Sequence, residues 1–253
     1  MPEEERANLV AHLAELRARL LRTLLYAALG MAAMWFVYAP VYRFLVQPIR
    51  QPLESLGGQL TVRGLLEGLL VKLEIVLVGG LILAAPLILY EVWAFVAPGL
   101  TRSERRAARP LVPAAGLLFL LGAAMGYAIT KPTVTVLLRY IPPDTRAWLT
   151  LNETVLLLLK FYVAFGLGFQ LPIVIVLLAK IGIVDSAMLK RRWREAVVGI
   201  FLLAAVITPT WDPITLTVAA VPMVLLYVAT IGAVMLVERG ARKAQARDDS
   251  LAG

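Results

Sequence analysis

The chain has 253 residues, of which 60% are hydrophobic and 17% are charged, with a mean hydropathy of +0.80 and a net charge of +8. This composition is too apolar for an ordinary soluble domain, and its apolar residues come in blocks, which indicates one membrane domain over residues 1–253. The absence of cysteine excludes disulfides and thiolate chemistry. Basic loops that orient a membrane protein explain the positive charge better than a nucleic-acid partner does.

The first predicted element is an amphipathic helix over about residues 8–20. Its leucines recur at helical spacing and form one apolar stripe, made of Leu9, Leu13, Leu16, Leu20 and Leu24. We therefore expect this helix to lie along the inner membrane surface before the chain turns into the bilayer. Glu15 is on its polar side, with Arg19 one turn further on. The simplest interpretation of Glu15 is an i,i+4 ion pair with Arg19, which contributes about 0.2–0.5 kcal/mol.

Two membrane spans follow, because about 20 helical residues cross a hydrocarbon core of about 30 Å. The sequence predicts them at residues 21–39 and 73–97. Glu91 is inside the second span, seven residues before Pro98 and roughly 10 Å from the helix end by helical rise. An ionisable group at this depth requires a partner or access to water.

The loop after the second span, LTRSERRAARP, places Glu104 among four arginines. One interpretation is an ion pair between Glu104 and a neighbouring arginine. Glu15 and Glu104 are also two acids at the same leaflet, each beside arginines. Together they could dock a pair of incoming guanidinium groups, because carboxylates bind guanidinium bidentately. The residues alone leave both interpretations open.

The third and fourth spans are predicted at residues 110–129 and 153–180. Gln170 is ten residues before Lys180 in the fourth span, roughly 15 Å deep. Nearby glycines thin the helix, and Pro172 removes a backbone donor. We therefore expect a kinked helix with a polar side chain facing a concavity.

The last apolar stretch is interrupted by TPTWDPI, whose prolines and Asp212 predict a tight turn between two spans, residues 195–208 and 214–237. The fifth span is short. The twelve residues between Glu195 and Thr208 extend roughly 18 Å, so we expect local membrane thinning or tilted helices.

Basic residues fix the orientation of the six spans. The two terminal segments, 1–22 and 238–253, and the loops at 98–109 and 180–194 together hold 17 Lys and Arg. The three other segments outside the spans hold 7, and Lys160 inside a span completes the total of 25. The positive-inside rule then places both termini and the Glu104 loop in the cytoplasm.

Four separate segments closely resemble the TatC family, the central subunit of the twin-arginine protein translocase. They are HLAELRARL at 12–20, PLILYEVWAFVAPGLTRSERR at 86–106, FGLGFQLPIVIVLL at 165–178, and ITP at 207–209 followed by AAVPM at 219–223. The resemblance runs from about residue 9 to 237. It implies an all-α, polytopic protein with six transmembrane helices and a concave TatC-like scaffold, in the cytoplasmic membrane of a bacterium or archaeon.

The resemblance also implies a function. The chain would bind the paired arginines in signal peptides of folded precursors, whose export draws on the proton gradient. The two family glutamates that carry this recognition map onto Glu15 and Glu104. Arg17 matches a functionally sensitive position, and Phe95 and Pro98 lie in the segment that shapes the same surface.

Other matched positions concern partners and structure. Thr208 matches a family position implicated in docking the single-span partners, TatA-like and TatB-like subunits, whereas a nearby family glutamine is Leu216 here. Pro48 matches a structural proline, and Asp212 is interpreted as a turn residue. The family also implies lipid contact and a homo-oligomer within a larger complex.

The chain departs from the family at two intramembrane positions. The family usually carries Gln where this chain has Glu91, and Glu where this chain has Gln170. Our hypothesis is that one carboxylate is kept in a shared concavity while its host helix changes. The simpler alternative is that Glu91 reaches cytoplasmic water and Gln170 bonds to a nearby backbone group.

Other classes of function are weighed against the receptor. A small-solute secondary transporter would use Glu91 as a proton or ion site, but such carriers often have internal repeats, and none is evident. A structural scaffold without a ligand is a third possibility. His12 is the single histidine and no P-loop is present, so we expect no catalytic residue, metal or cofactor.

Overall fold

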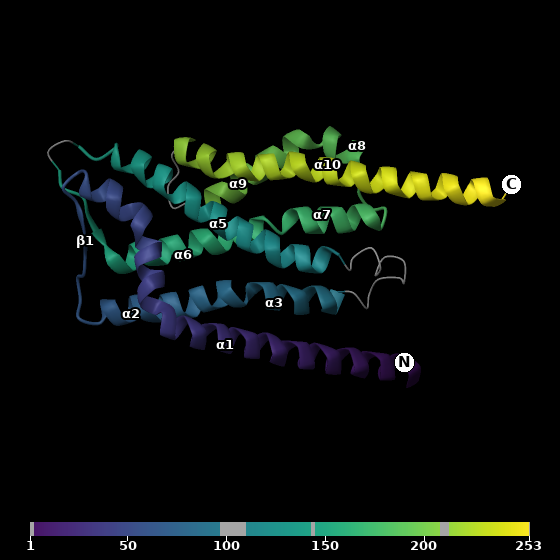
Figure 1. Cartoon of the computed structure of the whole chain (residues 1–253), viewed down its shortest axis with the longest axis horizontal. Helices are drawn as coiled ribbons and strands as arrows, with labels where there is room; N and C mark the ends of the chain where they lie inside the picture. The colour runs from purple at the N-terminus through teal and green to yellow at the C-terminus, as the bar shows by residue number, and fades with distance from the viewer. Residues whose placement is uncertain (1–2, 97–109, 143–144, 208–212, 253) are drawn as a thin grey trace. The chain divides into compact units, whose positions relative to one another are not determined.

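The computed structural model describes residues 3–96, 110–142, 145–207 and 213–252, and these are almost entirely helical (Figure 1). In order, the elements are α1 (Glu3–Glu54), β1 (Gln59–Thr61), α2 (Glu67–Glu74), η1 (Ile75–Gly79), α3 (Gly80–Val96), α5 (Leu111–Leu138), β2 (Trp148–Thr150), α6 (Leu151–Gly168), α7 (Leu171–Lys180), α8 (Ser186–Arg191), α9 (Trp193–Ile207) and α10 (Pro213–Ala252). The predicted all-α class is confirmed. The two short strands are an addition to it.

The predicted spans are present as helices. In the part of the chain that the structure describes, five stretches are long and apolar enough to cross a membrane: Leu13–Glu54, Glu67–Phe95, Leu111–Leu138, Leu151–Lys180 and Leu216–Gly240. The predicted fifth span corresponds to α9, a helix of 15 residues. At 1.5 Å per residue α9 reaches about 22 Å, which is shorter than a hydrocarbon core of about 30 Å.

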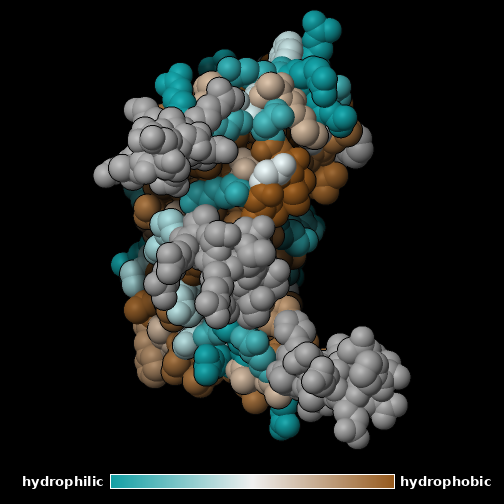
Figure 2. Space-filling model, turned by 90° about the vertical axis from the view of Figure 1, so that its right-hand side faces the viewer, coloured by the Kyte–Doolittle hydropathy of each residue, from teal (hydrophilic) through white to brown (hydrophobic). Residues whose placement is uncertain are grey.

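The outer surfaces of these helices are apolar. Leu13, Leu20, Leu24 and Leu29, all on α1, are each more than half exposed. Large apolar side chains in such numbers on a surface mark contact with lipid or protein. The view onto the end where α1 begins shows hydrophilic (teal) and hydrophobic (brown) residues side by side (Figure 2).

Helix α1 differs from the prediction. The expected surface helix at 8–20 and the first span at 21–39 form one helix, with no turn between them. No glycine or proline occurs between residues 3 and 29, so nothing interrupts the backbone hydrogen bonds where the hydropathy changes. The helix also continues past residue 39 to Glu54 and bends in its second half (Figure 1), where Pro40, Pro48 and Pro52 remove backbone donors.

The contacts divide the chain into two compact units, and the prediction of a single domain stays a prediction. The first unit comprises residues 1–120 and 146–159. In this unit α1 packs along η1 and α3, and the packing is closest at Gly30 and Gly80. A Cβ on Gly80 would lie 2.6 Å from the Cα of Met31. The two glycines therefore allow the backbones of α1 and α3 to approach each other.

The predicted external loops of the first unit are joined by strands β1 and β2 together with Glu67, which we call the clasp. Strands β1 and β2 pair in parallel, with Gln59 opposite Trp148 and Thr61 opposite Thr150. Beside them, the carboxylate of Glu67 accepts hydrogen bonds from the backbone N–H of Arg63 at 2.5 Å and of Asn152 at 2.9 Å. Glu67 therefore caps the first turn of α6 and links it to the start of α2.

The second unit comprises residues 121–145 and 160–253, and in it α10 packs against α7, α8 and α9. The predicted kink in the fourth span is present, because α6 ends at Gly168 and α7 begins at Leu171, with Pro172 in its first turn. Helix α8 is tied to α10, since Ser186 donates from its N–H and its hydroxyl to Glu238, both at 2.6 Å.

Helix α10 is longer than the predicted last span and runs on from residue 237 to Ala252. The residues after the span are rich in alanine, arginine, lysine and glutamine. These are good helix formers in water, so the helix continues beyond the apolar stretch.

Candidate functional site

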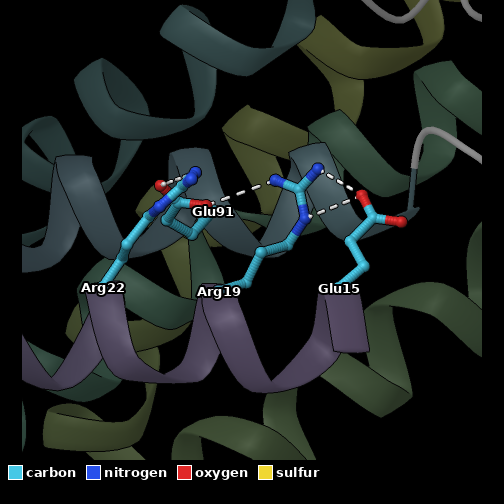
Figure 3. A network of polar contacts seen from close by, with 4 residues as sticks. All are labelled: Glu15, Arg19, Arg22 and Glu91. Atoms are coloured by element: carbon cyan, nitrogen blue, oxygen red, sulfur yellow. Dashed lines mark hydrogen bonds and ion pairs between the residues drawn. The ribbon is translucent and has the colours of Figure 1, made fainter. Parts of the chain in front are cut away.

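Glu15 and Arg19 form the ion pair that their i,i+4 spacing predicts. Arg19 donates to one oxygen of Glu15 from Nη2 at 2.6 Å and from Nε at 3.1 Å. The Glu15 side chain is 35% exposed and the Arg19 side chain 20%. In the close view the second oxygen of Glu15 points away from Arg19 (Figure 3).

Arg19 also reaches across to α3. Its Nη1 donates to Oε2 of Glu91 at 3.2 Å, and Nη1 of Arg22 lies 3.8 Å from Oε1 of the same carboxylate (Figure 3). The Glu91 side chain is only 3% exposed. We call these four residues, Glu15, Arg19, Arg22 and Glu91, the α1–α3 charge cluster.

The arrangement of this cluster follows from elementary electrostatics. A carboxylate buried as deeply as Glu91 requires a close opposite charge, because an unpaired buried charge is strongly unfavourable. The close approach of α1 and α3 at Gly30 and Gly80 brings Arg19 and Arg22 to Glu91. With two carboxylates and two guanidinium groups, the cluster has no net charge when all four are ionised.

The cluster has an inner end and an outer end. Glu91 is the buried inner carboxylate, Glu15 is the partly exposed outer one, and one guanidinium joins them. Guanidinium presents its donors as a planar fork, so a carboxylate that accepts two of them is shaped for arginine more than for lysine. Glu15 is therefore an accessible carboxylate in a geometry that suits an arginine side chain.

The other residues of the predicted binding surface are placed only in part. Arg17 is exposed on α1, and its spacing of two residues from both Glu15 and Arg19 puts it on another side of the helix. Phe95 is half-buried on α3, one turn beyond Glu91. Glu104 and Pro98 lie outside the described residues, so the predicted pair of Glu15 and Glu104 stays a prediction.

The two intramembrane polar residues have different partners. Gln170 lies at the start of α7 and donates from Nε2 to the carbonyl of Gly166 at 3.4 Å, which is the backbone contact that the simpler alternative expects. For Glu91 that alternative is wrong, because Glu91 is buried against two arginines and does not reach water. The two residues belong to different compact units, and the exchange hypothesis stays a prediction.

The remaining predicted positions lie inside helices or outside the described part of the chain. Pro48 is buried inside α1, and Pro172 is in the first turn of α7. Thr208 and Asp212 fall among the residues that the structure does not describe.

The bridge that Arg19 makes to Glu91 and the contact of Arg22 with Glu91 were not predicted from the sequence. A signal was present, because Glu15, Arg19 and Arg22 follow one another at spacings of four and three residues and so share one face of a helix. This charged face continues into the predicted span at 21–39. Charges that enter a span require partners on a neighbouring helix.

Two further observations bear on other functions. Within the described ranges, no group of three or more His, Cys, Asp or Glu could hold a metal ion. A cavity of about 240 Å³ in the second unit lies between α7, α9 and α10, and none of the described side chains that line it is charged.

Comparisons with known proteins agree with the predicted resemblance. The family model described as "Sec-independent protein translocase protein (TatC)" matches residues 11–222. The Sec-independent protein translocase protein TatC of Deinococcus radiodurans is 39% identical over 234 residues, which is 89% of this chain and 85% of the relative. The protein TatC of Koribacter versatilis is 35% identical over 91% of this chain and 86% of the relative.

A solved structure described as "Crystal Structure of Twin Arginine Translocase Receptor- TatC in DDM" is also similar. It has a TM-score of 0.76 and 31% sequence identity, over 88% of this chain and 98% of that chain. The six spans predicted from the sequence agree with this fold, and the solute-carrier alternative finds no support. The chain therefore belongs to the TatC family, the Sec-independent protein translocase proteins of the membrane.

Proposed function

We propose that this chain is the receptor subunit of a twin-arginine translocase and that Glu15 is one of two carboxylates that bind the signal peptide. The observation that carries the proposal is the contact between Glu15 and Arg19. Glu15 already holds a guanidinium through two donors, at 2.6 and 3.1 Å, and is still partly exposed. The same carboxylate thus has the geometry to accept an arginine from a peptide.

The second carboxylate in this proposal is Glu104. It follows from the sequence, where Glu104 lies beside arginines in the loop that is predicted to be cytoplasmic. Two acids at one leaflet would take one peptide arginine each. Hydrogen bonds to a charged group contribute about 1.5–3 kcal/mol each, so the loss of either acid would weaken binding strongly. Arg17, Phe95 and Pro98 would shape the surface around the two acids.

Membership of the family implies a translocase complex with other subunits. We propose TatA-like and TatB-like single-span proteins as these subunits, with Thr208 at their docking edge, and further copies of this chain in the same complex. Export of folded precursors would draw on the proton gradient across the membrane.

Binding of a labelled signal peptide to the purified full-length protein tests the receptor site. The peptide carries paired arginines, and a matched peptide carries paired lysines in their place. We expect tighter binding of the arginine peptide. We also expect Glu15→Gln and Glu104→Gln each to weaken it by about tenfold or more, which corresponds to the loss of ~1.4 kcal/mol.

Glu153→Gln is the control. Glu153 is an exposed acid in the first turn of α6, and this substitution removes the same charge at a position far in sequence from the α1–α3 charge cluster. A receptor site at Glu15 is excluded if Glu15→Gln and Glu153→Gln bind the arginine peptide equally well. A scaffold without a ligand would show no preference between the two peptides.

A further inference from the structure

The contact between Glu15 and Arg19 raises a problem for any incoming arginine, because the carboxylate it needs already has a partner. Arg19 makes its two shortest contacts in the cluster with Glu15. A peptide arginine must therefore replace these donors. Replacement is favourable only if Arg19, whose side chain is mostly buried, keeps a carboxylate of its own.

Glu91 is that carboxylate. It lies 3.2 Å from Nη1 of Arg19, so Arg19 already contacts both acids and needs no large movement to leave Glu15. Glu91 is held on α3, opposite α1, and it is almost completely buried, which places it out of reach of an exposed guest. It can accept Arg19 without being a binding site for the peptide itself.

We propose that Arg19 is an internal stand-in for a signal-peptide arginine. Without peptide, Arg19 occupies Glu15; when a peptide arginine binds Glu15, Arg19 moves fully onto Glu91. Glu91 is then a positioning residue for the receptor site, since it acts through Arg19. This inference rests on the proposed function and assigns the roles of Arg19 and Glu91 within it.

The charges of the cluster fit this exchange. In the free protein, two guanidinium groups face two carboxylates. In the bound state, Glu15 faces the peptide arginine, while Glu91 faces Arg19 and Arg22. In both the free and the bound state, each carboxylate therefore contacts a guanidinium, and the large cost of an unpaired buried charge is avoided.

The test is a set of variants in which the net charge is controlled. Glu91→Gln leaves Arg19 with Glu15 as its sole carboxylate in the cluster, so Arg19 competes more strongly with the peptide. We expect binding of the arginine peptide to weaken by about fivefold, which corresponds to the largest free energies measured for exposed ion pairs. Adding Arg19→Gln removes the competitor, and the double variant should bind at least as tightly as the wild type.

The matched control is the double variant Glu91→Gln with Arg22→Gln. It has the same net charge as the first double variant, but Arg22 contacts Glu91 at 3.8 Å and is not the donor on Glu15. Binding in this variant should stay about threefold or more below that of the Arg19 double variant. Both double variants leave position 91 neutral, so neither has an orphan buried carboxylate, and thermal unfolding in detergent checks that each is folded.

Restored binding in the Arg19 double variant, without restoration in the Arg22 double variant, supports the stand-in role. Equal binding by the two double variants overturns it, as does binding by the Arg19 double variant that is as weak as that of Glu91→Gln. Failure of the proposed function itself gives a different result: the wild-type protein and Glu15→Gln then bind the arginine peptide equally well. In that case the stand-in inference is overturned with it.

Discussion

Two buried carboxylates of the first unit, Glu67 and Glu91, differ in what holds them. They lie at opposite ends of the continuous helical stretch formed by α2, η1 and α3. Glu67 accepts hydrogen bonds from backbone N–H groups of Arg63 and Asn152. Glu91 faces the guanidinium groups of Arg19 and Arg22.

This difference separates a structural acid from one that can exchange partners. A backbone N–H leaves its acceptor only if the chain around it moves, so the contacts of Glu67 last as long as the fold does. A guanidinium leaves by rotation about side-chain bonds, so the contacts of Glu91 can change while the helices stay in place. Burial alone does not make a carboxylate functional; the nature of its donors decides what it can do.

The largest effect is expected from Gly80→Ala, which disturbs the packing of α1 against α3, the helix that carries Glu91. The new Cβ would lie 2.6 Å from the Cα of Met31 and 2.7 Å from its nitrogen, both backbone atoms that cannot move aside. Helices α1 and α3 must then separate, which costs about 3 kcal/mol. We expect lower thermal stability in detergent together with loss of arginine-peptide binding.

Gly232→Ala is the control for this change, because a Cβ on Gly232 of α10 has no neighbour within 4 Å. It should leave peptide binding unchanged. If Gly80→Ala were as stable as Gly232→Ala and bound peptide normally, the glycine contact would not be what brings Arg19 to Glu91.

A smaller effect, confined to stability, is expected from Glu67→Ala. The change leaves two backbone N–H groups of the clasp, both in part-buried hydrogen bonds, without their acceptor, and a donor that loses its partner is unfavourable to the extent that it is shielded from water. We expect the melting temperature to fall by about 5 °C with no change in the affinity for the arginine peptide. The measurement is thermal unfolding in detergent, followed by the peptide-binding assay.

Glu153→Ala is the matched variant, since Glu153 is also an acid in the first turn of α6 but is exposed. Its melting temperature should stay close to that of the wild type. Altered peptide binding in Glu67→Ala would remove the distinction between the two acids, because a backbone-held carboxylate would then contribute to the receptor site.

The sequence predicted those features of this molecule that depend on local spacing. The spans follow from apolar length, and the pair of Glu15 and Arg19 follows from an i,i+4 spacing. The interruption before α7 follows from Pro172. Continuity of α1 was missed because a change from amphipathic to apolar sequence was interpreted as a turn, whereas helices end at backbone signals and not at changes of hydropathy.

The rest of the site depends on contacts that no local pattern contains. Glu91 meets Arg19 because α1 and α3 pack closely at Gly30 and Gly80, residues far apart in the chain. Neither glycine differs in its local sequence from an ordinary glycine of a membrane helix. Strands β1 and β2 were missed for a related reason, since segments of three residues are too short to show an alternating pattern.

The smallest effect is expected from Arg22→Gln, which sharpens the comparison within the charge cluster itself. Arg22 is 59% exposed and its Nη1 lies 3.8 Å from Glu91, whereas Arg19 is 20% exposed and donates to both acids. Exposed pairs at such a distance contribute little, so the loss of stability should be within about 0.5 kcal/mol. Thermal unfolding of Arg22→Gln beside Arg19→Gln measures the difference.

The contrast between these two variants decides which guanidinium contributes most to the pairing of the buried Glu91 side chain. If Arg19 does so, Arg19→Gln leaves the carboxylate with one distant partner and is clearly the less stable variant. Equal loss of stability in both variants would mean that Arg22 moves in to replace Arg19. Arg19 could then leave Glu91 as well as Glu15, and Glu91 would not be the residue that holds Arg19 when a peptide arginine binds Glu15.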